Sequence, residues 1–179
     1  MAITQGLTTN CAKSCAGGVK RIWIANFDDV ASITFDGSEQ ITAITMVATK
    51  VFYEVQLKRN SKSFTEQFNV SDDGCNNSLT QTFTGNGQCR DQDTRQFLIE
   101  AAKQSCCGII VLHEENNGQV VGWGFFDDLN ARLGGGTQIT TGTNLTDPSQ
   151  IVLELICDTV VDGAATVFTP GVAGILALV

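Results

Sequence analysis

The sequence predicts a mainly β protein: a sandwich or barrel-like pair of packed antiparallel sheets with one flanking α-helix at about residues 92–106. Three observations favour this fold class. The chain of 179 residues has 18 glycines and only two prolines, and its many threonines suit strands joined by tight glycine turns. Apolar and polar residues alternate along several segments, as in half-buried strands. Only one segment has apolar residues at helical spacing.

The chain contains neither an internal repeat nor a linker long enough to divide it. We therefore expect one β-rich domain over residues 1–179, with an N-terminal arm at about 1–18 and an apolar C-terminal extension at about 160–179. Strands are predicted in the first half at 19–27, 32–35, 41–46, 49–57, 63–70 and 79–84. The segment 49–57 has the clearest alternation, which predicts that Val51, Tyr53, Val55 and Leu57 share one face.

The helix follows a sequence typical of a helix start. Asp93-Thr94-Arg95-Gln96 resembles a capping box, the next apolar residues share one helical face, and Gly108 is a plausible stop. Strands at 109–113 and 119–126 are predicted to form a hairpin, because Asn117-Gly118 between two apolar segments favours a tight turn. Two further strands are expected at 138–141 and 151–157, after a flexible Gly134–Gly136 connection.

Charge and cysteine content exclude several classes of protein. The net charge of −8 argues against tight nucleic-acid binding by charge neutralisation. The start lacks a charged region followed by an apolar stretch, and no apolar run is long enough for a bilayer, so we expect no signal peptide, no membrane partner and synthesis in a cytoplasm. The seven cysteines are odd in number and include no CxxC pair, which predicts reduced thiols, no metal site and no cofactor.

The residues needed for catalysis are not found together, so we expect no enzyme and no catalytic residue. A triad would have to use the single histidine, His113, which we expect to face solvent from a strand. Neither a G-x-S-x-G motif nor a phosphate-binding loop occurs. Four carboxylate pairs lie at predicted strand ends or turns, where solvated side chains are expected: Asp28-Asp29, Asp72-Asp73, Glu114-Glu115 and Asp127-Asp128.

Exposed apolar residues point instead to self-assembly. The last twenty residues carry few charges and would favour aggregation if left in water. They can dock on their own domain or on a neighbouring copy, and we favour the neighbouring copy. The candidate assembly contacts are Ile3, Phe64, Phe68, Ile175, Leu176, Leu178 and Val179.

The order of elements resembles that of a known family. Lys50–Leu57 precedes Ser63–Glu66, and the helix Thr94–Ser105 is followed by the hairpin Ile110–His113 and Gly118–Gly124 and then by Thr141–Leu155. In these features the chain resembles structural proteins encoded by bacteriophages and prophages of the Bacteroidetes group, and through them the phage tail tube family.

The resemblance implies a virion protein assembled in the host bacterial cytoplasm. It implies hexameric rings in which one sheet of each subunit joins a continuous inner wall. The rings would stack through the N-terminal arm, a long loop at 58–90 and the C-terminal extension. Phage DNA would pass through without specific binding, and Glu54 and Glu154 are candidate acids of the channel. Other virion proteins would be further partners.

Two other functions remain open. A capsid-surface or head–tail connector protein would share a β-rich fold. A ligand- or carbohydrate-binding sandwich would need an exposed aromatic platform, for which Trp23 and Trp123 are the tryptophan candidates.

Overall fold

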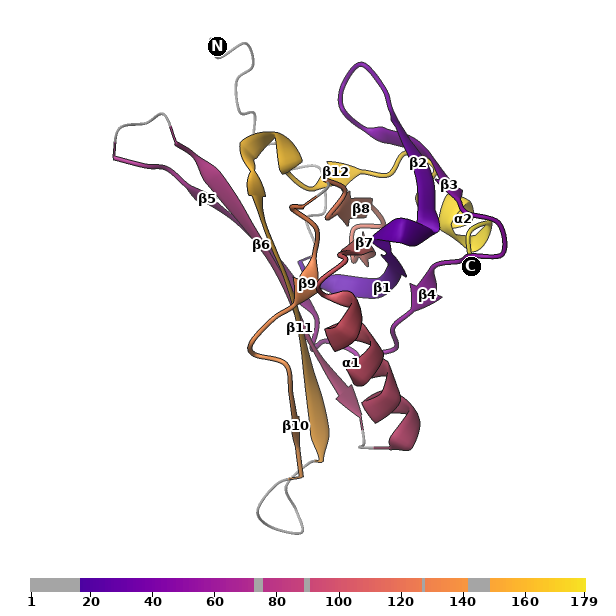
Figure 1. The fold of residues 1–179 in the computed structure, drawn as a ribbon, viewed down its shortest axis with the longest axis vertical. Coiled ribbons are helices and arrows are strands. Elements are labelled where there is room, and N and C mark those ends of the chain that lie inside the picture. Colours follow the sequence, from indigo (N-terminus) through magenta and orange to yellow (C-terminus); the bar gives the residue numbers. More distant parts are fainter. Residues whose placement is uncertain (1–16, 73–75, 89–90, 127, 142–148) are drawn as a thin grey trace.

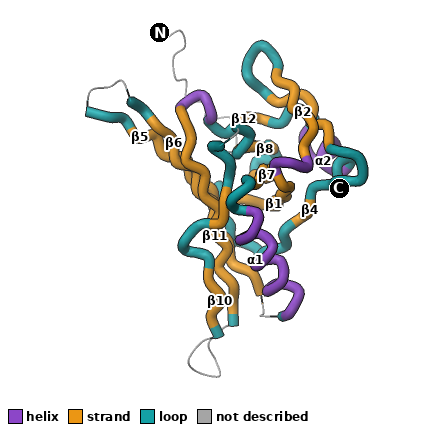
Figure 2. Tube along the Cα trace, viewed as in Figure 1, coloured by secondary structure: helices purple, strands orange, loops and turns teal. Residues whose placement is uncertain are grey.

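The computed structural model describes residues 17–72, 76–88, 91–126, 128–141 and 149–179. The described chain is mainly β, as the sequence predicts. Its strands form two larger antiparallel sheets and a two-stranded hairpin, with helix α1 beside the larger sheets (Figures 1 and 2). The sheets pack as in a sandwich and do not close into a barrel within the described residues.

The first large sheet, here called the central sheet, has the strand order β12-β8-β7-β1-β4. The strands β7 and β8 form the predicted hairpin, and Gly118 adopts a φ of 88° in its turn, a conformation that favours glycine. The strand bounds are Val19–Asn26 for β1, Tyr53–Glu54 for β4, Ile109–Glu115 for β7, Val120–Trp123 for β8 and Thr166–Val167 for β12.

The second large sheet, here called the long sheet, has the order β10-β11-β6-β5, and β9 also pairs with β11. Its two middle strands are the longest described, with 11 residues each, and they pair along their whole length. The bounds are Ser63–Asn69 for β5, Ser78–Gln88 for β6, Arg132–Leu133 for β9, Gln138–Thr140 for β10 and Gln150–Val160 for β11.

The prediction of a single long loop at 58–90 is therefore wrong. Most of its described residues form β5 and β6, which pair from Ser63 with Thr84 to Asn69 with Ser78. The hairpin projects beyond the central sheet in Figure 1. The predicted strand 79–84 is confirmed, but it is longer at its C-terminal end because Gly85 and Gly87 continue the ladder with β11.

A third layer covers the face of the central sheet that points away from the long sheet. It consists of the hairpin β2–β3 and the short helix α2, which contribute Ile41, Ile44 and Ile175 to one apolar cluster. The elements are β2 at Val30–Phe35, β3 at Ile41–Met46 and α2 at Gly171–Leu176, with short 3-10 helices η1 at Phe27–Asp29 and η2 at Val161–Gly163.

The central sheet consequently separates two apolar clusters. Alternate residues of β1 point to opposite sides: Ile22 and Ile24 pack toward the long sheet, and Trp23 and Ala25 pack toward the third layer. The strand β7 is divided in the same way. A sheet with both faces buried needs apolar residues at every position, which explains the uninterrupted apolar segments in β1 and β7.

Helix α1 spans Gln92–Gln104, close to its predicted range, but its start differs in detail. Asp91 is the N-cap, and its carboxylate accepts a hydrogen bond of 2.7 Å from the Thr94 N–H. The predicted cap, Asp93, lies inside the first turn. The acidic residue two positions earlier thus satisfies one of the free amide groups of the first turn. Gly108 follows the helix with a φ of 94°.

The segment 49–57 is mostly not a strand, although its alternation is the clearest in the sequence. Only Tyr53 and Glu54 pair with β1, and Phe52 is buried whereas Tyr53 is exposed. The Phe52 N–H donates to the carbonyl of Leu178, 2.8 Å away, rather than to a neighbouring strand. The chain here crosses from the third layer to the sheet edge, so its burial does not follow one sheet face.

The C-terminal extension packs on its own chain. Strand β12 pairs with β8, and Phe168 and Ile175 are buried in the cluster beneath the third layer. Leu178 also packs against this cluster. The preference for docking on a neighbouring copy is therefore wrong for these residues. The extension contains a second helix, α2, which is not predicted from the sequence.

Candidate assembly surface

The largest feature outside the two apolar clusters is the outer face of the long sheet, on the side away from the central sheet. Burial alternates along β11, where buried Ile151, Leu153 and Leu155 point inward and the residues between them point outward. Cross-strand partners share a face, so the register identifies the outward residues. They are Ser63, Thr65, Gln67, Asn69, Ser78, Thr80, Thr82, Thr84, Asn86, Arg132, Gln138, Thr140, Gln150, Val152, Glu154, Ile156, Asp158 and Val160.

Hydroxyl and amide side chains dominate this outer face. Three threonines follow one another along β6, and each faces a hydroxyl or amide residue of β5, as in the Thr82–Thr65 pair. Several are bonded to one another: the hydroxyls of Ser63 and Thr84 lie 2.7 Å apart, and the Asn69 amide donates to Thr80. No described helix or sheet covers this face (Figures 1 and 2).

The charged groups of the outer face are engaged by their neighbours. Arg132 lies 2.6 Å from the carboxylate of Asp158, and both are about half exposed. The third charged residue, Glu154, accepts a hydrogen bond from the Gly136 N–H. The face therefore has little free charge, although the whole chain carries a net charge of −8.

Glu154 also explains the glycine run 134–136, which is predicted to be a flexible connection. A Cβ atom at Gly134 or Gly136 would lie 2.5 or 2.6 Å from the Glu154 carboxylate oxygen, whereas one at Gly135 would meet nothing. The Thr137 hydroxyl bonds the backbone of Glu154 at 3.0 Å. The run is a turn folded closely around this carboxylate.

The two sides of the long sheet carry the strands β5 and β10, each with one partner among the described strands. Strand β5 pairs only with β6, and β10 pairs only with β11. One backbone edge of each strand therefore has no ladder in the described chain, and such edges can pair with another chain. The two strands lie at opposite ends of the order β10-β11-β6-β5.

The structure separates the predicted assembly contacts. Phe68 lies on the projecting part of β5 and is 58% exposed, and Leu176 and Val179 are exposed on the third layer. Phe64 is half-buried between the sheets, where its ring centre lies 4.6 Å from that of His113. Ile175 is fully buried. Ile3 lies outside the described residues.

The two candidate channel acids lie on different sheets. Glu54 is on β4 at the edge of the central sheet, and Glu154 is on the outer face of the long sheet. A wall made from one sheet can therefore carry only one of these two candidates. The sequence could not separate them, because both occupy alternating segments and only the strand pairing distinguishes the sheets.

His113 is fully buried and does not face solvent, contrary to the sequence prediction. The Trp123 indole N–H donates to its Nδ1 atom at 3.3 Å, and no described group bonds its Nε2 atom. Burial lowers the pKa of His113 to about 4, because a protonated ring at this position would carry its positive charge away from water. The side chain acts as a neutral member of the core.

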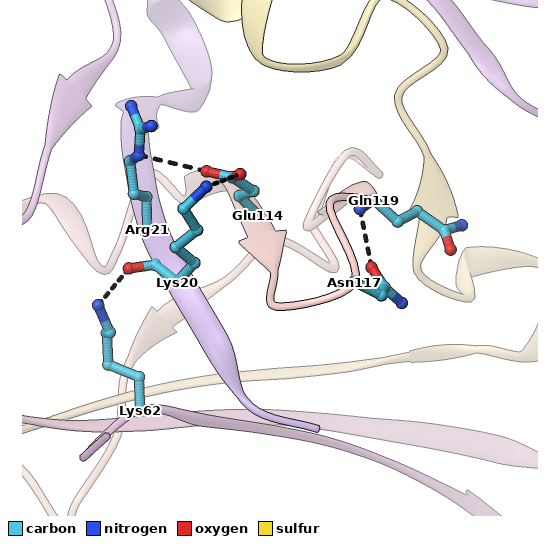
Figure 3. A network of polar contacts seen from close by, with 6 residues as sticks. All are labelled: Lys20, Arg21, Lys62, Glu114, Asn117 and Gln119. Carbon is cyan, nitrogen blue, oxygen red and sulfur yellow. Dashed lines mark hydrogen bonds and ion pairs between the residues drawn. The ribbon is translucent and has the colours of Figure 1, made fainter. Parts of the chain in front are cut away.

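Glu114 is also buried, which corrects the prediction of a solvated turn carboxylate. The Lys20 ammonium lies 2.6 Å from one of its oxygens, and the Arg21 Nε atom lies 3.2 Å from the other (Figure 3). Lys62 adds a bond to the backbone carbonyl of Lys20. Asp29 is similarly buried and pairs with Lys50 at 3.0 Å. These acids stabilise the ends of strands in the central sheet and third layer.

The polar groups of the β7–β8 turn complete this region. The Asn117 side chain accepts from the Gln119 N–H at 2.8 Å (Figure 3), and the Asn116 amide donates to the Gly17 carbonyl at 2.6 Å. Such side-chain bonds to nearby backbone favour turns. The turn thus holds the entry of β1 beside the end of β7.

Three further observations bear on alternative functions. Trp23 and Trp123 are buried, so neither forms the aromatic platform expected of a carbohydrate-binding module. Within the described residues, no three or more His, Cys, Asp or Glu side chains are grouped to hold a metal ion. None of the described helices is long and apolar enough to span a bilayer.

Comparisons with protein families, with curated proteins and with solved structures found no match to this chain.

Proposed function

We propose that this protein is a structural subunit of a phage virion, a tail tube protein that forms stacked hexameric rings around a channel for DNA. The observation that carries the proposal is the long sheet, which within the described residues has one uncovered face and a strand with an unpaired edge at each side. The resemblance in element order supplies the class of assembly. The ring would join the long sheets of successive copies into one wall.

Strand direction supports this mode of joining. Each neighbouring pair in the order β10-β11-β6-β5 is antiparallel, so β5 and β10 run in opposite directions. In a second copy related by rotation, β10 would run antiparallel to the β5 of the first copy. Because β5 lies level with residues 78–84 of β6 and β10 lies level with residues 86–88, the strands must tilt relative to the ring axis, as they do in barrels, for the two edges to meet. Such head-to-tail contacts close into rings and leave no unpaired sheet edge.

The outer face would then line the channel. Its hydroxyl and amide side chains would keep water at the wall. Arg132 and Asp158 form an ion pair there, and the Glu154 carboxylate keeps its charge while it accepts a hydrogen bond from the Gly136 N–H. DNA phosphates would meet few unpaired cations, and tight binding by release of counterions would not occur. The wall we propose is thus weakly acidic, because Glu154 lies on it without a cation partner whereas Glu54 lies outside it.

The mass and image of the assembled species test this function. Light scattering and negative-stain electron microscopy of the purified full chain should show rings or tubes, and six-fold symmetry would support the tail tube. Rings of another symmetry would favour a head–tail connector. A strictly monomeric chain at high concentration would contradict self-assembly.

A pair of matched variants tests the edge. Thr65→Lys with Gln67→Lys places two charges on the edge strand β5, where lysines oppose edge pairing. The control, Thr82→Lys with Thr80→Lys, changes the directly opposite residues on the middle strand β6. We expect the first variant to remain monomeric and the control to assemble. Equal assembly of both would show that β5 is not the contact strand.

A further inference from the structure

An exposed pair of adjacent thiols lies beyond the end of helix α1 and takes no part in the proposed assembly surface. Cys106 and Cys107 are both exposed, and their sulfur atoms lie 3.6 Å apart. The described cysteine elsewhere, Cys157, is buried in the core. Two thiols on one side of the backbone can act on a ligand together, which a single surface cysteine cannot.

The backbone holds the two thiols in place. The N–H groups of Cys107 and Gly108 both donate to the Gln104 carbonyl, at 2.9 and 3.0 Å. The Ser105 hydroxyl donates to the Ala101 carbonyl and accepts from the Leu133 N–H, which ties the turn to strand β9. The Cys106 thiol itself points back to the Lys103 carbonyl at 3.1 Å. The separation of the sulfurs is thus set by a bonded turn.

Geometry distinguishes two uses of such a pair. A disulfide needs sulfurs about 2.0 Å apart and Cα atoms usually about 4.4–6.8 Å apart, whereas adjacent Cα atoms across a trans peptide are only about 3.8 Å apart. A disulfide here would therefore be strained. Two thiolates bound to one tetrahedral ion at about 2.3 Å lie about 3.8 Å apart, close to the 3.6 Å observed.

We propose that Cys106 and Cys107 form a bidentate site for a soft d10 cation such as Zn²⁺ or Cd²⁺. Thiolates are the preferred ligands of such ions. Both thiols release their protons to solvent as the cation binds, no electrons are transferred, and the remaining positions of the ion are filled by water or a small ligand.

Alkylation of this pair of thiols can be measured separately from that of the other cysteines. Trypsin cleavage after Lys103 and Arg132 yields a peptide, 104–132, that contains Cys106 and Cys107 and no other cysteine. The reduced full chain would be treated with Cd²⁺, from a substoichiometric amount to an excess over all seven cysteines, and then alkylated briefly with iodoacetamide. Mg²⁺, which does not prefer thiolates, serves as the control ion.

We expect Cd²⁺, but not Mg²⁺, to protect both thiols of this peptide from alkylation. Cys106→Ser and Cys107→Ser should each abolish protection of the remaining thiol, and Cys157→Ala should leave protection of the pair unchanged. Full alkylation of both thiols in excess Cd²⁺ would overturn the proposal, as would protection that persists in either single serine variant. A peptide found two hydrogen atoms lighter under reducing conditions would show a disulfide instead.

Discussion

The central sheet and the long sheet differ in the number of faces they bury. The central sheet packs apolar residues on both sides, from Ile22–Ala25 in β1 and Ile109–Leu112 in β7. The long sheet buries only one side, and its outer face carries threonine and amide residues. The comparison shows that the same antiparallel ladder can serve as an internal support or as a surface, depending on what covers it.

The two sheets should therefore respond differently to substitution. Residues of the central sheet contribute to the free energy of unfolding through packing, because both faces are enclosed. Outward residues of the long sheet contribute little to stability, and under the proposed function they act at contacts with other copies and with DNA. The predictions below test this division, beginning with the largest expected change.

Trp23→Ala should destabilise the central sheet most. The side chain is almost fully buried among the third-layer residues, and its truncation leaves a large cavity, so we expect a loss of about 3–5 kcal/mol in the free energy of unfolding. Urea denaturation followed by circular dichroism measures it. A loss below about 1 kcal/mol, typical of an average substitution, would contradict the assigned burial.

Ile175→Ala tests whether the C-terminal extension belongs to its own chain. Ile175 is fully buried, and its neighbour Leu176 is 62% exposed. We expect Ile175→Ala to cost about 2–5 kcal/mol and Leu176→Ala to change the free energy by less than about 0.5 kcal/mol. Unfolding should be measured at low and high protein concentration. An Ile175 effect that appears only at high concentration would indicate docking between copies.

His113 should make stability depend on pH. Its pKa is about 4 in the folded chain and about 6.5 when unfolded, so the unfolded state binds its proton first as pH falls. No stability is lost above about pH 6.5, and up to about 3 kcal/mol is lost as pH falls to about 4. Comparison with His113→Gln over this range isolates the effect from other groups. Parallel pH curves for the two proteins would show that His113 is accessible to protons when folded.

In the glycine turn around Glu154, alanine substitutions at two adjacent glycines should differ in their effect on stability. Gly136→Ala places a Cβ atom against the Glu154 carboxylate, whereas Gly135→Ala meets open space. Displacing the carboxylate weakens its hydrogen bond to the backbone, and we expect a loss of about 1 kcal/mol for Gly136→Ala. Thermal unfolding of the two variants provides the measurement. A larger loss for Gly135→Ala would contradict the turn geometry.

Thr82→Ala should have the smallest effect on the unfolding of the isolated chain. Thr82 points outward from the middle of the long sheet, so its removal leaves no buried cavity. We expect a change within about 0.5 kcal/mol, measured in the same urea experiment as Trp23→Ala. A loss comparable to that of Trp23→Ala would mean that the outer face is covered by another part of the chain.

Local sequence patterns predicted most elements because their causes are local. The helix 92–106 and the hairpin at Asn117-Gly118 depend on spacing and turn chemistry within a few residues. The alternation of 49–57 misled the prediction because burial there comes from contacts with the distant Leu178. The N-cap is Asp91 and not Asp93. The sequence did not distinguish them, because both aspartates lie close to the start of the helix.

The candidate surface was only partly predictable. Apolar residues at the C-terminus correctly indicated a need for burial, but the covering partner was the chain's own third layer. Glu54 and Glu154 have similar sequence surroundings, and pairing with β1 or with β6 separates them. The outer face could not be recognised beforehand, because outward threonines gather there only after β5, β6 and β11 pair.

The sequence by itself thus determined the β-rich class, the helix and the tight turns, since these follow from residue spacing and backbone preference. Tertiary structure alone decided which sheet has two buried faces, where His113 and Glu114 lie, and which strand edges remain unpaired. These features depend on contacts between residues far apart in the sequence, such as Lys20 with Glu114 and Phe52 with Leu178. Burial is a property of the whole packed chain. A local pattern of apolar residues indicates that they need to be covered, but it does not indicate which part of the chain covers them.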